Sequence, residues 1–222
     1  MSSGLFITFE GTEGSGKSTQ ISLLAQCLRA MSRNVRTLRE PGGTPIGEEI
    51  RHTLKHSAVN HAMTAEAELL LMNASRAQLV REIIRPALAA GNVVLCDRFY
   101  DSTTAYQGYG RELDLKMVDD IIDVAVGKTR PDLTLLLLVP QTVSEARRLA
   151  RQPTLALPFK RDRIEEADRS FFERVARGYQ AIAAAEPQRV KSIEASGMIE
   201  SIAAEIWRLV EPLLSRSGLN RR

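Results

Sequence analysis

The sequence has few cysteines and lacks several features that mark specialised protein classes. Its two cysteines, Cys27 and Cys96, lie far apart and form no C-x-x-C pair, which argues against a disulfide framework. Both lie among apolar residues, so we expect buried thiols in a reducing compartment. The chain also shows no internal repeat and no low-complexity stretch, which excludes a repeat protein or a compositionally biased one.

Long hydrophobic runs and a strong charge of either sign are missing as well. The longest apolar run, around Leu133 to Val139, is far too short to span a bilayer. No basic region precedes an apolar run at the N-terminus, so no secretory signal is visible. Lys and Arg number 30 against 27 Asp and Glu, and they are scattered, which gives no argument for nucleic acid binding. We therefore expect a cytoplasmic protein with no membrane or nucleic acid partner.

What remains is the composition of an ordinary globular protein. The 222 residues are 44% hydrophobic and 26% charged, which suits one α/β domain over residues 1–222 with a polar, frayed tail at about 215–222. Short apolar runs recur, and those expected as strands are Leu5–Phe9, Val35–Arg39, Val93–Cys96, Leu133–Val139 and Arg189–Ile193. Helical patterns separate them, so the sequence predicts a doubly wound parallel sheet.

The helical patterns fill the gaps between these strands. They are expected after the first strand through Met31, over 46–55, 64–90 and 115–126, from about 143, through 171–179, and over 199–214. Pro86 should kink or interrupt the long pattern in which it lies. In such folds the ligand binds outside the carboxyl ends of the strands. The polar segments that follow the strands should therefore converge on one cleft.

A glycine-rich segment follows the first strand and precedes a helical pattern. It matches G-x-x-x-x-G-K-[ST] and consists of Gly11, Thr12, Glu13, Gly14, Ser15, Gly16, Lys17, Ser18 and Thr19. Glycines let successive backbone N–H groups turn around a phosphate, and the helix N-terminus adds its positive end. Lys17 then reaches the β- and γ-phosphates, and Ser18 holds Mg²⁺. The alternative is a glycine-rich turn that matches by chance, but the strand–turn–helix context favours binding of a nucleoside triphosphate.

The strand at Val93–Cys96 ends in Asp97 and Arg98. A carboxylate in this place serves Mg²⁺ or its water shell in proteins with a phosphate loop, whereas its alternative role is a helix N-cap or a loop residue. Arg98 would place a guanidinium where it grips a second phosphate, and its alternative is a surface ion pair. An Asp–Arg pair here favours an enzyme whose acceptor is itself a phosphate.

Other polar residues have two readings each. Arg76 lies on a mostly apolar helical face, which suggests either a cleft or a side chain that snorkels from the edge of the core. The segment 147–163 is either a lid over the triphosphate or a solvated basic loop. Its basic residues are Arg147, Arg148, Arg151, Lys160, Arg161 and Arg163. His52, His56 and His61 lack further ligands nearby, so we expect exposed histidines rather than a metal site.

Taken together, these segments resemble the thymidylate kinase family over nearly the whole chain. The matching pieces are 9–19, 39–44, 69–76, 97–99, 105–108 and 162–165. The resemblance implies transfer of the γ-phosphoryl group of ATP to dTMP, giving dTDP and ADP with Mg²⁺. It also implies a five-stranded parallel sheet of the P-loop nucleoside monophosphate kinase type, a mobile lid at about 147–163, and a homodimer.

The resemblance further implies roles for single residues. Those at the substrate are Glu13, Arg39, Met72, Arg76, Arg98, Ser102, Thr103, Tyr106 and Gln107. Arg98 would bind the dTMP phosphate, Arg76 the thymine edge, and Glu13 would lie near the sugar and phosphate of the acceptor. Tyr106 would occupy the place of a ribose 2′-OH and favour deoxyribose. Met72 stands where the family commonly has an aromatic residue, and its thioether still packs on a ring face.

The catalytic arginine is also expected from the resemblance. Gly14 takes the place of a basic residue, as in the branch whose lid supplies that arginine, and we favour Arg151. Together with Lys17 and Arg98, Arg151 completes the expected catalytic set, while Ser18 and Asp97 complete the metal site. Two alternatives stay open: another nucleotide or deoxynucleoside kinase of the same fold, and a nucleotide-dependent switch, although no N-K-x-D guanine signature is present.

Overall fold

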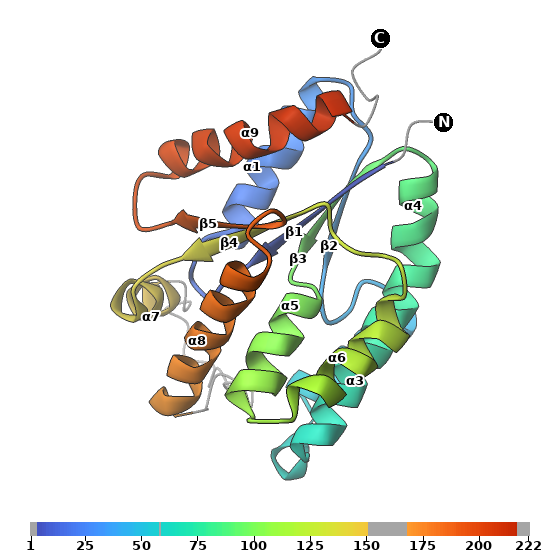
Figure 1. The fold of residues 1–222 in the computed structure, drawn as a ribbon, viewed down its shortest axis with the longest axis vertical. Coiled ribbons are helices and arrows are strands. Elements are labelled where there is room, and N and C mark those ends of the chain that lie inside the picture. The colour runs from blue at the N-terminus through green and yellow to red at the C-terminus, as the bar shows by residue number, and fades with distance from the viewer. Residues whose placement is uncertain (1–3, 58, 151–167, 217–222) are drawn as a thin grey trace.

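The computed structural model describes residues 4–57, 59–150 and 168–216. These residues contain a 5-stranded sheet of parallel strands in the order β2-β3-β1-β4-β5 (Figure 1). The strands are β1 Leu5–Glu10, β2 Val35–Arg39, β3 Val93–Asp97, β4 Leu133–Leu138 and β5 Val190–Glu194. The predicted doubly wound parallel sheet is therefore confirmed, and every strand end differs from the expected one by a single residue or not at all.

The helices lie on both faces of the sheet. They are α1 Lys17–Ala30, α2 Pro45–Lys55, α3 Ala65–Leu79, α4 Arg85–Ala89, α5 Tyr100–Thr103, α6 Leu115–Val126, α7 Gln141–Ala150, α8 Arg169–Ala185 and α9 Ile199–Arg216. Short η1 (Asn60–Ala62) and the π-helical turns η2 (Val80–Ile84) and η3 (Thr104–Gly110) join them. In Figure 1, α1 and α9 cover one face, and α3, α5, α6 and α8 cover the other. Since α9 reaches Arg216, it includes the first residues of the tail expected to be frayed.

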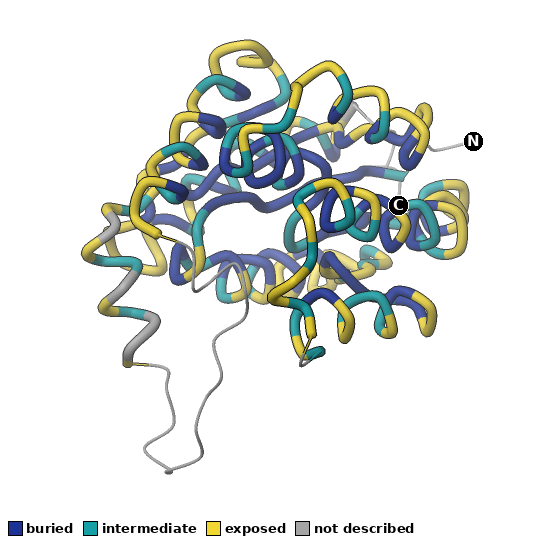
Figure 2. Tube along the Cα trace, turned by 90° about the horizontal axis from the view of Figure 1, so that it is seen from below, coloured by how far each residue is buried: buried dark blue, intermediate teal, exposed yellow. Residues whose placement is uncertain are grey.

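Side chains of successive strand residues point to opposite faces of the sheet, so the core is divided between the two faces. Ile7 and Phe9 of β1 are buried with α1 and α9, whereas Phe6 is buried with α3 and α6. Successive side chains of a strand point to opposite faces, so Glu10 lies on the same side as Phe6, the side covered by α5 and α8. Figure 2 shows buried segments through the sheet and along the inward sides of the helices, with exposed segments outside.

The long helical pattern expected over 64–90 is divided into three pieces. Helix α3 begins after Thr64, whose hydroxyl accepts a hydrogen bond from the Ala67 N–H at 3.2 Å. It passes into the π-helical turn η2, and α4 then starts with Pro86 in its first turn. Proline has no N–H to donate and is tolerated in the first turn of a helix. The predicted interruption is confirmed, and it begins at Val80, ahead of Pro86.

One expectation about buried residues was wrong, and one helical segment was not predicted. Cys27 is exposed, while Cys96 is buried as expected. The buried stripe of α1 contains Ile21, Leu24 and Leu28, and position 27 falls beside it on the solvent side. The segment 100–110, for which no helix was predicted, is helical throughout as α5 and η3. Among the described helices, none is long and apolar enough to cross a membrane.

Candidate functional site at the carboxyl edge of the sheet

The register of the sheet brings the polar segments together at one edge. Phe9 of β1 pairs with Asp97 of β3, and the Arg98 N–H donates to the Phe9 carbonyl at 2.9 Å. On the other side of β3, the Glu40 N–H donates to the Asp97 carbonyl at 3.0 Å. The phosphate loop, the segment 40–44 and the pair Asp97–Arg98 therefore converge as predicted. Residues 151–163 of the expected lid, with Arg151, lie outside the described residues.

The phosphate loop has the backbone that its glycines predict. Gly14 and Gly16 have φ angles of +77° and +96°, in the left-handed region that favours glycine. A Cβ at Gly14 would lie 2.6 Å from the Ser144 carbonyl oxygen of α7, so the loop also needs glycine for this close approach. Gly16 is the N-cap of α1, and among the described residues no side chain caps that helix. Uncapped N–H groups at a helix N-terminus suit a phosphate ligand.

Lys17 is bound by the loop itself. Its ammonium donates to the carbonyl oxygens of Gly11 and Thr12 at 3.0 and 2.9 Å. Burial, together with the positive charge of Arg98, lowers the pKa of Lys17 to about 7, against the opposing effect of Asp97. Phosphate oxygens favour the charged ammonium, so binding of a triphosphate should raise the pKa of Lys17 again.

Ser18 and Asp97 form the pair expected to serve Mg²⁺. The Ser18 hydroxyl donates to the Asp97 carboxylate at 3.2 Å. A hydroxyl and a carboxylate are hard oxygen donors, and Mg²⁺ commonly uses one or two of them together with waters and substrate phosphates. The two side chains therefore fit the metal, which would sit beside the phosphate loop.

Arg98 lies at the centre of a group of hydroxyls. Its backbone has a φ of +70°, which is uncommon outside glycine. Nη1 donates to Ser102 Oγ at 3.1 Å and to the Tyr179 hydroxyl at 3.3 Å, and Nη2 donates to the Tyr106 hydroxyl at 3.3 Å. The guanidinium carbon also lies 5.0 Å from the centre of the Tyr106 ring. A surface ion pair, the alternative reading of Arg98, is therefore wrong.

Sequence reasoning missed Glu10, which anchors this group. Its buried carboxylate accepts the Phe99 N–H at 2.7 Å, the Ser102 hydroxyl at 2.6 Å and the Tyr179 hydroxyl at 2.8 Å. Burial raises the pKa of Glu10, as does Asp101, whereas Arg98 and the hydrogen bonds lower it. A carboxylate that closes an apolar strand beside the phosphate loop was an available signal. Arg98, Glu10, Ser102, Tyr106 and Tyr179 are called the Arg98 cluster below.

Arg76 is buried rather than snorkelling. Its Nε and Nη2 lie 2.8 Å from Glu40 Oε2, and its side chain is 3% exposed. Nη1 donates to Asn73 Oδ1 and Thr103 Oγ1, and Nη2 donates to the Phe99 carbonyl. The guanidinium thus connects the segment that follows β2 with α3 and α5, beside the Arg98 cluster. Burial raises the pKa of Glu40 to about 7 against the opposing charge of Arg76, and its Oε1 is buried without a hydrogen-bond partner in the described structure.

The other predicted substrate-binding residues form no hydrogen bond with Arg98 in the described structure. Arg39 forms a two-pronged ion pair with Glu48 of α2 at 2.7 and 3.1 Å. Gln107 is buried and donates to Glu68 of α3 at 2.8 Å, away from Arg98. Met72 is half-buried on α3. Glu13 has an exposed side chain, and its carbonyl accepts a hydrogen bond from Ser144 of α7.

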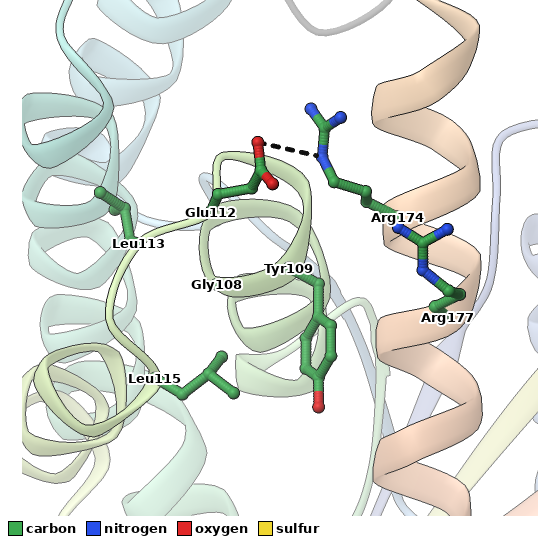
Figure 3. Close-up of a pocket in the computed structure, with 7 residues that line it drawn as sticks. All are labelled: Gly108, Tyr109, Glu112, Leu113, Leu115, Arg174 and Arg177. Atoms are coloured by element: carbon green, nitrogen blue, oxygen red, sulfur yellow. Dashed lines mark ion pairs between the residues drawn. The ribbon is translucent and has the colours of Figure 1, made fainter.

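A surface hollow of about 240 Å³ lies elsewhere, between η3, the start of α6, and α8 (Figure 3). It is lined by Gly108, Tyr109, Glu112, Leu113, Leu115, Arg174 and Arg177, and by none of the predicted site residues that the structure describes. Arg174 is already bound there, to Glu112 at 3.7 Å and to the Gly110 carbonyl at 2.9 Å. His52, His56 and His61 are exposed, as expected.

Comparisons with known proteins place this chain in a family. A family model described as thymidylate kinase matches residues 9–206. The chain belongs to the thymidylate kinase family. A thymidylate kinase from Chlorobium luteolum is 47% identical over 91% of this chain and 94% of its own length. One from a Synechococcus strain is 47% identical over 98% of this chain and 99% of its own.

Solved structures give the same family. The crystal structure of a thymidylate kinase from Ehrlichia chaffeensis is 32% identical in sequence, with a TM-score of 0.74. The match covers 94% of this chain and 99% of the Ehrlichia chaffeensis chain. The resemblance read from the separate motifs is therefore confirmed for both the family and the fold, and the enzyme class is that of a thymidylate kinase.

Proposed function

We propose that this thymidylate kinase family member transfers the γ-phosphoryl group of ATP to dTMP, giving dTDP and ADP. The observation that carries the proposal is the position of Arg98. The residue that follows β3 is hydrogen-bonded to β1 beside the phosphate loop, so a second anionic group bound there would face the triphosphate. Two phosphates held end to end are what direct phosphoryl transfer requires.

The mechanism rests on positioning and electrostatics. The dTMP phosphate is already ionised, so its attack needs no general base. The phosphate loop and Lys17 hold the donor, and Arg98 holds the acceptor and offsets its charge. Ser18 and Asp97 would hold Mg²⁺, which neutralises phosphate charge when it is bound. Arg151, as the lid arginine, remains a prediction.

Base recognition belongs to α3 and α5 in this proposal. Arg76 and Met72 are assigned to thymine, and Thr103, which accepts a hydrogen bond from Arg76, lies on the same side. Each of the Arg76 nitrogens already donates to a protein acceptor, so contact with a base requires one of those bonds to be exchanged. Tyr106, under Arg98, is assigned to discrimination against ribose.

A homodimer is part of the proposal and is supported by exposed apolar side chains. Ile46 on α2, Leu70 on α3 and Val124 on α6 are 57%, 56% and 76% exposed, and α3 packs against both of the other helices. Exposed apolar side chains on helices that pack against one another are candidates for a subunit interface. Light scattering of the purified protein would distinguish a dimer from a monomer. A cytoplasmic location remains a prediction.

A coupled ADP-release assay tests the proposed reaction. With ATP as the donor, dTMP should be the best acceptor among dTMP, dUMP, UMP, CMP and thymidine. A preference for thymidine would instead indicate a deoxynucleoside kinase, because that acceptor carries no phosphate for Arg98. ATP consumption that does not depend on any acceptor would indicate a nucleotide-dependent switch. The reported relatives give no support to either alternative.

A further inference from the structure

Tyr179 brings a distant part of the chain into the Arg98 cluster. It lies on α8, 169 positions after Glu10, and its hydroxyl donates to the Glu10 carboxylate at 2.8 Å. The same hydroxyl accepts from Arg98 Nη1 at 3.3 Å and lies 3.1 Å from Ser102 Oγ. Its side chain is buried, and its ring packs edge-on against that of Tyr106 at 6.3 Å.

The chemistry of the partners fixes the direction of these hydrogen bonds. A carboxylate only accepts and a guanidinium only donates. The hydroxyl protons of Tyr179 and Ser102 therefore point at Glu10, and their lone pairs face Arg98. Burial and the nearby Glu10 raise the pKa of Tyr179 well above its usual range, so its proton is retained. Within the described part of the chain, Arg98 Nε has no partner and is left to bind a ligand.

We propose that Tyr179, acting with Glu10, is a positioning residue that holds the Arg98 guanidinium in the orientation that binds the acceptor phosphate. The proposal rests on the proposed function, since it assumes that Arg98 binds that phosphate. A long arginine side chain loses considerable rotamer freedom when it is fixed. The hydroxyls of Tyr179 and Ser102, which are aligned by the Glu10 carboxylate, already fix the Arg98 side chain in the free protein. Less conformational entropy is then lost when dTMP binds, so the affinity for dTMP is higher.

Tyr179→Phe tests the proposal because it removes the hydroxyl and keeps the ring. The affinity for dTMP, measured by calorimetry, should fall about tenfold, the effect of one hydrogen bond to a charged group. The affinity for thymidine and the KM for ATP should change less than about twofold, since neither involves Arg98 and the acceptor phosphate. In an Arg98→Ala background, Tyr179→Phe should have no further effect on dTMP binding, because residues that act as a unit are not additive.

Tyr109→Phe is the matched control. The Tyr109 ring packs against Gly178, next to Tyr179 on the same helix, and its hydroxyl has no hydrogen-bond partner among the described residues. This variant should bind dTMP and thymidine as the wild type does. If Tyr179→Phe does not fold, Ser102→Ala removes the other hydroxyl that joins Arg98 to Glu10, and it should show the same loss for dTMP alone.

The outcomes separate this inference from the proposed function. A wild-type protein that neither binds nor phosphorylates dTMP overturns both. A wild type that does so, with a Tyr179→Phe variant of unchanged dTMP affinity, overturns the inference alone. Equal losses for dTMP and thymidine, or a full effect of Tyr179→Phe in the Arg98→Ala background, would show a structural role and overturn it as well.

Discussion

The phosphate loop and the Arg98 cluster lie at the same edge of the sheet but are built from different parts of the chain. The loop is a contiguous segment, 11–19, which offers backbone groups and the Lys17 side chain. The cluster gathers side chains from β1, the segment after β3, and α8. The loop should therefore depend on glycine conformation, and the cluster should depend on the packing of distant elements.

Removing the central cation from each region is the strongest test of this contrast. Lys17→Ala and Arg98→Ala should each lower kcat/KM by about 10²- to 10³-fold, the usual cost of losing a charged group that stabilises the transition state. Arg98→Ala should also raise the KM for dTMP more than that for ATP. Steady-state kinetics with each substrate varied would measure both effects.

Circular dichroism and thermal unfolding would show that each variant remains folded. Lys116→Ala is a suitable control, because its ion pair with Asp120 on α6 is exposed and contributes little. An Arg98→Ala enzyme with normal kcat/KM for dTMP would refute the assignment of the acceptor site.

A glycine substitution tests the backbone-built region specifically. Gly14→Ala should destabilise the protein by about 1–3 kcal/mol, because alanine is disfavoured at a φ of +77° and its Cβ would approach the Ser144 carbonyl. Gly197→Ala is the matched control, since a Cβ there meets nothing within 4 Å. Urea unfolding of both variants gives the comparison. Equal stability of the two would contradict a tight packing of the loop against α7.

The smallest expected effect concerns the protonation of Lys17 when ATP binds. The pKa of Lys17 is lowered to about 7, so this lysine is mostly neutral at pH 8, and the phosphates should return it to the charged form. Calorimetry in buffers of different ionisation enthalpy should show uptake of close to one proton at pH 8, and much less at pH 6. Lys17→Arg, which keeps its charge, should show none from this group.

The same shift links Lys17 to stability. Its pKa in the folded protein lies below the ordinary value of 10.5, so the unfolded chain binds this proton more tightly. Lys17 therefore makes the protein lose stability as the pH falls from about 10.5 towards 7.

Wild-type ATP binding at pH 8 without proton uptake would show that Lys17 is already charged in the free protein.

Structural features that are determined by a short stretch of sequence could be predicted. The strand Val35–Arg39 and the helix Leu115–Val126 were expected with the ends that the structure has, because their apolar patterns are local. The phosphate loop was predicted with its lysine and serine, since one contiguous motif determines its backbone. The convergence of segments at the carboxyl edge followed from the parallel order of the strands.

Features that depend on tertiary contacts could not be predicted. Tyr179 reads as one apolar position on a helix, and only the packing of α8 brings its hydroxyl to Glu10. Arg76 had two readings from its helical face, and neither included a buried ion pair with Glu40. The helical segment after Arg98 was also missed. It begins where Glu10 accepts the Phe99 N–H, a contact between residues 89 positions apart.

The most direct test of the account is a crystal structure with dTMP and a non-hydrolysable ATP analogue bound together. The triphosphate should lie against the backbone of residues 11–19, and the dTMP phosphate should lie on Arg98. The acceptor oxygen should lie about 3–3.5 Å from the γ-phosphorus, in line for transfer. Two nucleotides bound too far apart for direct transfer, or a dTMP phosphate that does not touch Arg98, would contradict it.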